Sequence, residues 1–460
     1  MQSTLSKVRK LRPNEIFLEV AQSEFQFAIP CYWLTLEAKE EVTEGQVEQT
    51  LRILYRNIDI LRLCIRKEKE DFWFYEMDEE RILLQVLKNQ SPYEVFDKET
   101  HTNFNSATGP LWRAIYFPDN ETVKESNVYT SNIMLTFDHA IVDGFTCFSI
   151  CNSFLMVLND VIGGKVENSY DFGKFNDGHE IEVITQQRME YLNKNPEYFA
   201  EIKTFLTNFD KQKIRFDEFF PLPEDVEKKT KYIHGEIDKE TTKKLLKVFK
   251  SKGISFNSGF SAAINWALME LFVEKGLTDK EIDLQSEHAI NVRRYWKKSS
   301  TLQLGSHSTS LKLSSKTDKN VGANFWEYAR NFGSELKNAL DNMQGIDVKL
   351  QMKTSNFGKT KVDYSKLMED YPPPKSYYCT TNMGDLKSIV QGKREYVRIK
   401  WLTRGVASHG MNASIVSFIH TYEGRFLYCI GYSTHIVRDD LANLLVDRII
   451  GKLNILSNMQ

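Results

Sequence analysis

Long apolar segments are missing from the sequence. No stretch of 18 or more apolar residues occurs, and the first ten residues are not followed by the apolar run that a secretory signal needs. The last five residues match neither a peroxisomal targeting signal nor a prenylation motif. We therefore expect a cytoplasmic protein without a membrane span.

The sequence also has no excess of one charge and few cysteines. Its 60 basic residues are balanced by 62 acidic ones without a long block of either sign, so we expect no binding to nucleic acid or to anionic membranes. The six cysteines are scattered, and no two have the spacing of a zinc knuckle or a redox dithiol. We expect reduced core thiols, no metal site, and a monomer that binds small molecules.

The sequence does contain enough apolar material for two packed domains. Its 460 residues, 41% of them hydrophobic, exceed one ordinary core and suit two domains of about 200 residues each. Strand-like segments such as 129–137 alternate with helical spacing such as that of 43–57. This pattern, found in both halves, predicts an α/β (α+β) protein with interleaved strands and helices.

The domain boundary is predicted from turn-forming residues. The segment Phe219-Phe220-Pro221-Leu222-Pro223, followed by a charged run, is the best linker candidate. We therefore expect a first domain at 1–215, a linker at 216–230 and a second domain at 231–460. One long helical region is expected before the linker, at 180–208.

One segment combines a reactive side chain, a helix start and backbone freedom. His139 follows the strand candidate 129–137, and Asp143 and Gly144 come four and five residues after it. A neutral imidazole accepts a proton near physiological pH because its unperturbed pKa is about 6.5. Asp143 could hold the loop through an ion pair, and Gly144 would let the backbone turn tightly and a ligand approach. This segment is the candidate active site.

The spacing between His139 and Asp143 is weak evidence by itself, because His435 and Asp439 repeat it. Asp439 stands at the start of the last expected helix, where a carboxylate suits an N-cap, and no glycine follows it. We interpret that second pair as structural. For His139, the alternative is a buried histidine with satisfied hydrogen bonds.

The order of several motifs resembles the CoA-dependent acyltransferase superfamily over nearly the whole chain. That superfamily includes chloramphenicol acetyltransferase, alcohol acetyltransferases, plant BAHD enzymes, mycobacterial polyketide-associated acyltransferases and condensation domains. Its signature is His-x-x-x-Asp-Gly, which His139, Asp143 and Gly144 match. The chain lacks the Asp-Phe-Gly-Trp-Gly segment of plant enzymes, so it is more similar to alcohol acetyltransferases and condensation-like acyltransferases. Other similar segments are Ile60-Leu61-Arg62, Gly109-Pro110-Leu111-Trp112-Arg113, Ile290-Asn291-Val292-Arg293, Leu304-Gly305-Ser306 and Thr381-Asn382-Met383-Gly384.

The resemblance implies a fold and a mechanism. It implies two chloramphenicol acetyltransferase-like domains, each a mixed sheet flanked by helices, with the active-site channel between them. His139 would be the general base and acyl-CoA, in particular acetyl-CoA, the co-substrate, with no permanently bound cofactor. Asp143 would pair with Arg293 and support the loop, although Arg293 could instead be a surface charge. Thr381 and Asn382 would be candidates for an oxyanion or substrate turn, with ordinary turn residues as the alternative.

Three functions remain open at this point. The first is transfer of an acyl group from acyl-CoA to the hydroxyl of a small, hydrophobic alcohol. The second is a condensation-type or N-acyltransferase that uses an amine acceptor or a donor carried by a carrier protein. The third is a catalytically silent protein that binds a hydrophobic ligand in the same channel, against which the intact His139, Asp143 and Gly144 argue.

Overall fold

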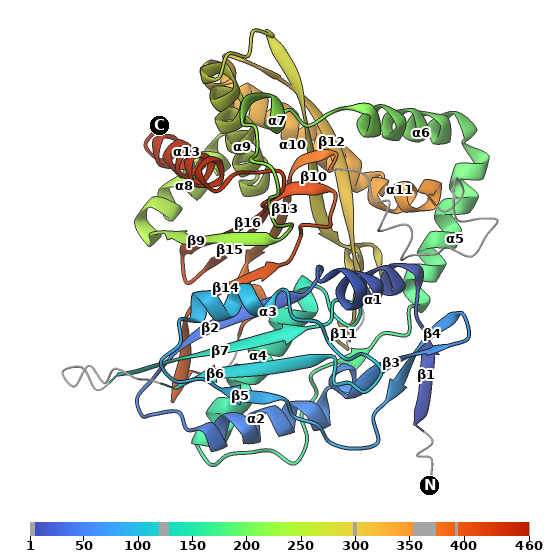
Figure 1. Cartoon of the computed structure of the whole chain (residues 1–460), viewed down its shortest axis with the longest axis vertical. Coiled ribbons are helices and arrows are strands. Elements are labelled where there is room, and N and C mark those ends of the chain that lie inside the picture. Colours follow the sequence, from blue (N-terminus) through green and yellow to red (C-terminus); the bar gives the residue numbers. More distant parts are fainter. Residues whose placement is uncertain (1–4, 119–127, 298–300, 353–373, 392–393, 460) are drawn as a thin grey trace.

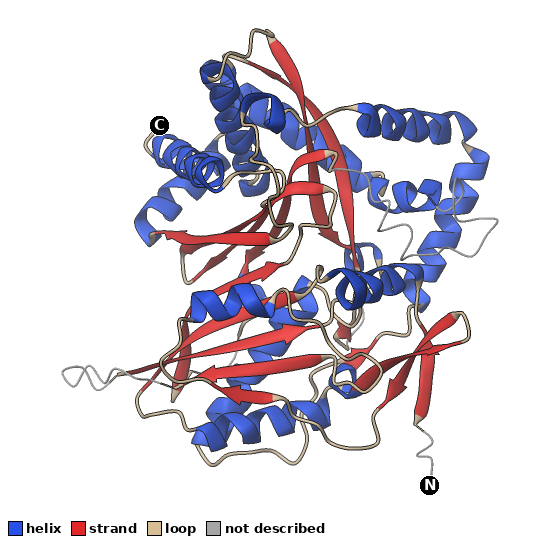
Figure 2. Ribbon diagram, in the orientation of Figure 1, coloured by secondary structure: helices blue, strands red, loops and turns tan. Residues whose placement is uncertain are grey.

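The protein folds into two lobes, each built on a mixed β-sheet with helices packed against it (Figure 1, Figure 2). The structure is a computed structural model that describes residues 5–118, 128–297, 301–352, 374–391 and 394–459. The expected α/β class with two sheet-and-helix units is confirmed.

The first lobe contains a five-stranded sheet. In sheet order its strands are β14 (Val397–Val406), β2 (Pro30–Ala38), β7 (Tyr129–Phe137), β6 (Trp112–Phe117) and β5 (Leu84–Val86). Only β5 and β6 are parallel neighbours. A smaller antiparallel sheet beside it comprises β1 (Ser6–Lys10), β4 (Asp71–Glu76) and β3 (Leu63–Glu68).

Along each strand of the first sheet, successive side chains alternate between the two faces of the sheet. On β2, Tyr32 and Leu34 face the main core, whereas Cys31 and Trp33 face the other side. Helices α2 (Glu44–Asn57) and α4 (Gly144–Ile162) pack on the core face, and α3 (Pro92–Glu99) packs on the opposite one. Helix α1 (Pro13–Phe25) also contributes to the main core.

The second lobe contains a six-stranded sheet. In sheet order its strands are β12 (Ser308–Asp318), β10 (Glu281–Asn291), β13 (Ser376–Asp385), β15 (Ala413–Tyr422), β16 (Arg425–Ser433) and β9 (Thr230–Ile237). Helices α8 (Lys239–Ser251), α9 (Phe256–Glu274), α10 (Phe325–Asp341) and α13 (Asp439–Ser457) supply its core. On the opposite face, Val416 and Phe418 of β15 pack toward Tyr232 and Val406. That face meets the first lobe.

Two pairings join segments that are distant in the sequence. Strand β14 lies in the second half of the sequence, yet it pairs antiparallel with β2 in the first sheet, where its orange ribbon lies beside blue strands (Figure 1). The short strands β8 (Lys174–Phe175) and β11 (Gln303–Leu304) pair in parallel. The two sheets therefore do not divide the chain at the segment 216–230.

The segments around the expected linker are packed rather than free. Phe216, in the short helix α7 (Phe216–Phe219), and Phe220 are buried in the second core. The long helix expected at 180–208 is two helices, α5 (His179–Lys194) and α6 (Pro196–Lys211). Pro196 explains the break, because a proline disfavours helical backbone at the residue before it. Both helices pack on α11 (Gln344–Met352) of the second lobe.

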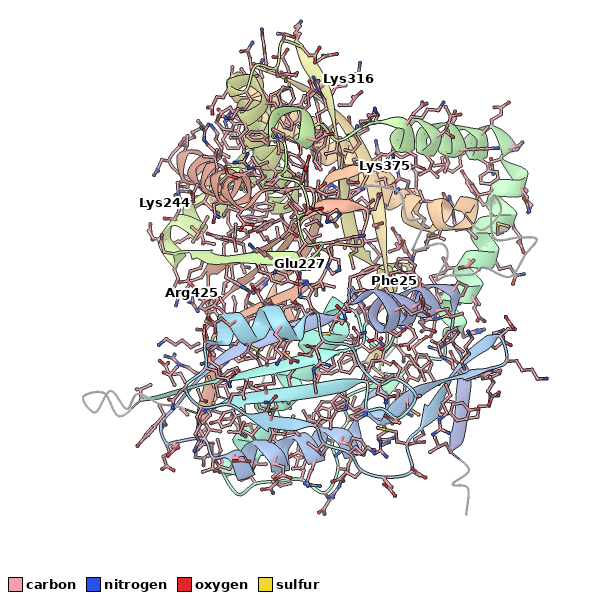
Figure 3. All side chains as sticks on the ribbon, viewed as in Figure 1. Phe25, Glu227, Lys244, Lys316, Lys375 and Arg425 are labelled. Carbon is pink, nitrogen blue, oxygen red and sulfur yellow. The ribbon has the colours of Figure 1, made fainter. Side chains whose placement is uncertain are left out.

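Helix α4 is long and apolar enough to cross a membrane by length and composition alone. In this fold most of it is buried, because it is the central helix of the first core. The outer surface carries both charges, as Figure 3 shows by its interspersed nitrogen and oxygen atoms. Lys316, labelled there, forms an ion pair with Glu281. All six cysteines are free, and only Cys379 is not fully buried.

Candidate active site

His139 lies in the turn that connects β7 to α4. The turn is fixed by local hydrogen bonds: the backbone N–H of Ala140 donates to Asp138 Oδ1 over 2.8 Å, and His139 Nδ1 lies 2.8 Å from the carbonyl oxygen of Val142. A carbonyl oxygen only accepts hydrogen bonds, so Nδ1 carries the hydrogen of the neutral ring. The lone pair is thereby left on Nε2, for which the described residues offer no hydrogen-bond partner.

The surroundings of His139 favour this neutral form. Burial lowers the pKa of the imidazole, and the positive charge of Arg404 lowers it further. The Val142 carbonyl and the Asp143 carboxylate act in the opposite direction, but the pKa remains below its usual value. A half-buried histidine with these neighbours is unprotonated at neutral pH.

Asp143 is the N-cap of α4, with 3% of its surface exposed. Its Oδ1 accepts a hydrogen bond from Thr146 N at 2.9 Å, while its Oδ2 accepts from Arg293 Nη1 at 2.6 Å and from His307 N at 2.8 Å. Burial raises the pKa of this carboxyl group, but Arg293 and the backbone donors outweigh it and the pKa is lowered. Asp143 forms no hydrogen bond with His139, so it holds the loop rather than the ring.

Arg293 reaches from the end of β10 into the first lobe. Its guanidinium contacts Asp143, and it also donates to Thr146 Oγ1 at 3.0 Å and to the carbonyl oxygens of Gln303 and Gly305 at 2.9 and 3.1 Å. Gly305 has a φ of +134°, a conformation that favours glycine. The guanidinium thus joins the α4 N-terminus to the turn that follows β11.

Thr146 is a site residue that the sequence analysis missed. Its hydroxyl donates to the carbonyl oxygen of Gly305 at 2.9 Å, and it accepts from Gly305 N at 3.1 Å and from Arg293. The only available signal was its place three residues after Asp143, where an N-cap side chain receives a backbone N–H. Nothing in the sequence indicates the contact with Gly305.

Gly144 leaves space beside the second lobe, and the expected approach of a ligand at this position stays a prediction. It is the first residue of α4, and its φ lies outside the left-handed region, so it does not serve a tight turn. A Cβ at this position would lie 3.1 Å from Met383 Sδ and 3.7 Å from the Tyr32 hydroxyl oxygen. Gly144 therefore allows β13 of the second lobe to approach the His139 loop closely.

Thr381 and Asn382 lie in strand β13 rather than in a turn, and the strand becomes irregular only after Asn382. Asn382 Oδ1 accepts from the backbone N–H of Gly384, two residues on, so its side chain serves the local backbone. Thr381 instead contacts Arg404. Arg404 donates to Thr381 Oγ1 at 3.1 Å and to the Thr381 carbonyl oxygen at 2.8 Å.

Arg404 and His420 are two further buried groups that the sequence analysis missed. Arg404, on β14, is 3% exposed, and His420, on β15, is 2% exposed. Burial and the charge of Arg404 lower the pKa of His420 to about 3, so the ring is neutral. Without knowledge that β14 joins the first sheet, the sequence gives no signal that Arg404 approaches His139.

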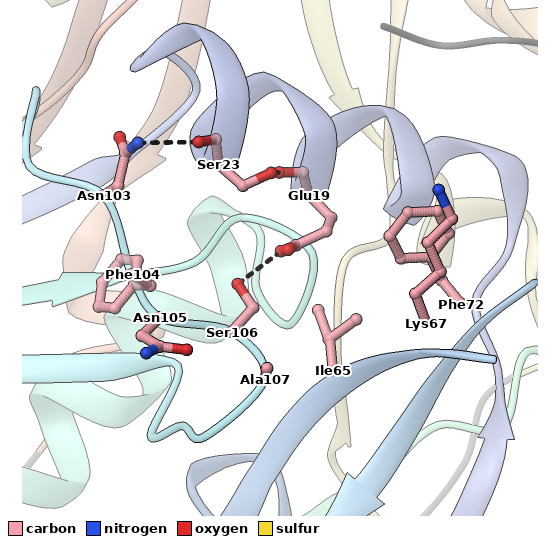
Figure 4. A pocket seen from close by; sticks show the side chains of 10 residues that line it. All are labelled: Glu19, Ser23, Ile65, Lys67, Phe72, Asn103, Phe104, Asn105, Ser106 and Ala107. Atoms are coloured by element: carbon pink, nitrogen blue, oxygen red, sulfur yellow. Dashed lines mark hydrogen bonds between the residues drawn. The ribbon is translucent and has the colours of Figure 1, made fainter. Parts of the chain in front are cut away.

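A pair of carboxyl groups lies behind the His139 turn. Burial and the neighbouring Glu19 raise the pKa of Asp138 well above its usual range. Glu19 accepts a hydrogen bond from Ser106 Oγ at 2.9 Å and, with Phe72 and Lys67, lines a pocket of about 580 Å³ (Figure 4).

The second histidine and aspartate pair is arranged differently. Asp439 is the first residue of α13 and not its N-cap, which is Arg438 without a capping side chain. The Asp439 carboxylate pairs with Lys231 and accepts from the Tyr432 hydroxyl, and it forms no hydrogen bond with His435. Within the described ranges, no group of three or more histidine, cysteine, aspartate or glutamate side chains could hold a metal ion.

Comparison with known sequences gives one family. The model of the alcohol acetyltransferase family matches residues 87–385, which is well over half of the chain and includes His139, Asp143, Arg293 and Thr381. No curated protein sequence matches the chain significantly.

Comparison with solved structures gives the same two-lobed fold. TRI3 trichothecene 15-O-acetyltransferase from Fusarium sporotrichioides matches with a TM-score of 0.71 at 12% identity, covering 98% of this chain and 95% of that one. The condensation domain of the monacolin K polyketide synthase MokA matches with a TM-score of 0.68 at 11% identity over 98% of both chains. Polyketide synthase associated protein 5 from Mycobacterium tuberculosis matches at 0.62 and 12%, over 99% and 98%. At such identities these likenesses establish the fold.

Proposed function

This chain belongs to the alcohol acetyltransferase family, and we propose that it transfers an acyl group, in particular acetyl, from acyl-CoA to the hydroxyl of a small hydrophobic alcohol. The chain is accordingly an acyltransferase. We propose acyl-CoA as the donor, an alcohol as the acceptor and a histidine as the catalytic base. His139 is the proposed general base.

The reaction needs one proton acceptor and no covalent enzyme intermediate. Nε2 of His139 takes the hydroxyl proton while the acceptor oxygen attacks the thioester carbonyl carbon, and the carbonyl electron pair moves onto its oxygen. When the tetrahedral intermediate collapses, the carbon–sulfur bond breaks. The imidazolium returns the proton to the thiolate, so the products are an ester and free CoA.

The tautomer of His139 is the observation that carries this proposal. Because Nδ1 donates to the Val142 carbonyl oxygen, the basic lone pair is on Nε2, and burial together with Arg404 keeps it unprotonated. Asp143 and Arg293 support the assignment, because they fix the loop from both lobes without taking the histidine's proton.

The test is a kinetic comparison of two histidine variants. We expect His139→Ala to lower kcat about 10²- to 10⁴-fold, the usual contribution of a general base. His435→Ala is the matched control, because His435 has the same spacing to an aspartate, and it should leave kcat unchanged. Thiol release is measured with acetyl-CoA and a panel of alcohols. Undiminished turnover by the His139 variant would exclude it as the base.

The same assay separates the other functions. The same acyl group is offered on CoA and on a carrier protein, and the alcohols are replaced by amines. Faster transfer from the carrier protein, or to amines, would replace the proposal by a condensation-type or N-acyl transfer, the chemistry class suggested by the condensation domain that shares this fold. Binding of ligands without turnover of any donor would indicate a silent binding protein.

A further inference from the structure

The pocket drawn in Figure 4 belongs to the first lobe alone. Its volume is about 580 Å³, and its walls are formed by α1, by β3 and β4, and by the loop after α3. Among the described residues, none from the second lobe and none from the His139 loop at 138–144 lines it. This pocket is therefore not part of the site proposed for acyl transfer.

The inner wall of the pocket carries a carboxyl group without a positive partner. Glu19 of α1 is 5% exposed, and its Oε2 accepts hydrogen bonds from Ser106 Oγ at 2.9 Å and from Gln22 Nε2 at 3.1 Å. Neither donor reaches the second oxygen, Oε1. No lysine, arginine or histidine of the described residues forms an ion pair with Glu19. Such a group favours a cationic partner, because burial penalises a charge that only neutral donors contact.

Asp138 adds a second carboxyl group behind Glu19. It is fully buried, its Oδ1 accepts from the backbone N–H of Ala140, and its Oδ2 is buried without a hydrogen-bond partner. Burial raises the pKa of Asp138, and the neighbouring Glu19 raises it further, whereas no positive charge lowers it. The bottom of the pocket thus has two acidic side chains and no cation among the described residues. This arrangement attracts a positively charged ligand.

The other walls favour an organic cation over a metal ion. Phe72 lies on one side of Glu19 and Phe104 on the other, and Ile65 lies below them (Figure 4). These side chains would remove an alkyl group from water. A metal ion needs several oxygen ligands at about 2.0–2.6 Å, and no group of three or more candidate ligands exists in the described part of the chain. Lys67, at the exposed edge, has its ammonium group 5.4 Å from the Phe72 ring centroid and forms no ion pair with Glu19.

We propose that this pocket binds a small organic ammonium ion, with the ammonium group against Glu19 and the alkyl group between Phe72 and Phe104. The ammonium group donates to Glu19 Oε1, and its charge compensates the acidic bottom of the pocket. The hydrogen bonds to Oε2 hold the carboxylate in place for this contact. The ligand is bound non-covalently, behind the turn that carries the proposed catalytic base.

The first experiment varies the ligand and uses the unmodified full chain. Calorimetric titration with butylammonium should give saturable binding, whereas neutral butyramide and anionic butyrate should bind at least about tenfold more weakly, because neither can donate a charged hydrogen bond to a carboxylate. Affinity should rise about fourfold per methylene from ethylammonium to butylammonium, as more apolar surface is buried. Equal affinity for butylammonium and butyramide would overturn the proposal, as would stronger binding of butyrate, potassium or calcium ions.

The second experiment varies the pocket. Glu19→Gln keeps the size of the side chain but removes its charge, and it should lower the affinity for butylammonium at least about tenfold. Glu24→Gln is the matched control, because Glu24 is exposed on the same helix and does not line the pocket. Thermal unfolding shows whether each variant is folded, and the ligand series on the unmodified chain tests the proposal independently of folding. Equal affinities for folded Glu19→Gln and the wild type would contradict the assignment.

Two further measurements check the sign of the ligand charge and the location of the site. Lys67→Met should not lower the affinity for butylammonium, because a lysine repels a cation; a lower affinity would contradict a cationic ligand. The affinity should also be the same in His139→Ala and in the presence of saturating acetyl-CoA, because the His139 loop does not line the pocket. Loss of binding in either case would place the amine in the acyl-transfer site and overturn the inference. The proposed function does not depend on these results.

Discussion

The protonation of His139 depends on a balance of burial, one buried cation and one carboxylate. Burial and Arg404 favour the neutral ring, whereas Asp143 and the Val142 carbonyl favour the charged one, and the pKa is lowered on balance. Catalysis needs the neutral form.

The pH dependence of kcat/KM should therefore be flat through neutrality. Because the folded pKa lies below the usual 6.5 and the base must be unprotonated, we expect kcat/KM to fall tenfold per pH unit only below a midpoint under 6.5. The measurement is kcat/KM for acetyl-CoA in overlapping buffers, with circular dichroism to check folding at each pH. A limb with its midpoint above 6.5 would be inconsistent with this environment.

Asp143 should contribute to stability more than to chemistry. Asp143→Ala leaves buried Arg293 unpaired, which typically costs about 3–5 kcal/mol of unfolding free energy. The loss should be present at pH 7 and shrink in acid, because the carboxylate has a lowered folded pKa and its contribution disappears as pH falls through that value. Urea unfolding at several pH values measures this.

An exposed ion pair serves as the control for Asp143. Glu37→Gln removes a carboxylate that pairs with exposed Arg398 and Lys400, and such pairs contribute below about 1 kcal/mol. Similar losses of unfolding free energy for the Asp143→Ala and Glu37→Gln variants would show that the Asp143 pair is not protected from solvent.

Some single residues of the candidate site could be predicted from the sequence. His139, Asp143 and Arg293 could be singled out because they belong to short motifs whose order is informative, and the structure brings Asp143 and Arg293 together. For Gly144 the left-handed backbone of a tight turn is not seen, the approach of a ligand stays a prediction, and the contact with Met383, 239 residues away in sequence, was not predicted. Arg404 could not be predicted, since its importance depends on strand pairing that no local pattern encodes.

Among the elements, β14 connects the two lobes most directly. It pairs with β2 in the first sheet, and its side chains reach β13 and β15 of the second sheet through Arg404. Regular helices and strands were predictable from periodicity. The position of β14 in the first sheet was not, because periodicity does not specify which strand is the partner.

The packing of β14 can be tested at Leu402. This side chain is fully buried in the first core, so Leu402→Ala should lower the unfolding free energy by about 2–5 kcal/mol. Leu444→Ala, on α13, is the control, because Leu444 is 38% exposed and should change stability by about 0.5 kcal/mol or less. Chemical denaturation compares the two. A loss at Leu402 as small as that at Leu444 would mean that β14 is not an integral strand.

For the whole molecule, the pairing of β14 with β2 leads us to expect that the two lobes depend on each other for folding. A fragment ending at residue 230 contains most of the first lobe but lacks β14 and Arg293. We expect it to lack cooperative unfolding, because the β2 edge and the core surface covered by Val397, Ile399 and Leu402 are left open. Heat unfolding followed by circular dichroism measures this, with the full chain as reference.

A peptide spanning 394–409 provides the complementary test. If β14 is the missing element, adding this peptide should restore part of the cooperative transition, whereas a peptide with Leu402→Pro should not, because proline cannot donate to the strand ladder. A fragment that unfolds cooperatively by itself would show that the boundary near residue 230 separates independent domains.

The position of β14 in the chain also affects biosynthesis. Strands β2, β6 and β7 and helix α4 emerge from the ribosome long before residues 397–406 are translated, an interval of roughly ten to fifty seconds at ordinary elongation rates. During that time the nascent chain presents an unpaired edge beside an apolar helix, which is a template for aggregation. We therefore expect the yield of active protein in a cell to depend on protection of this edge by chaperones during translation.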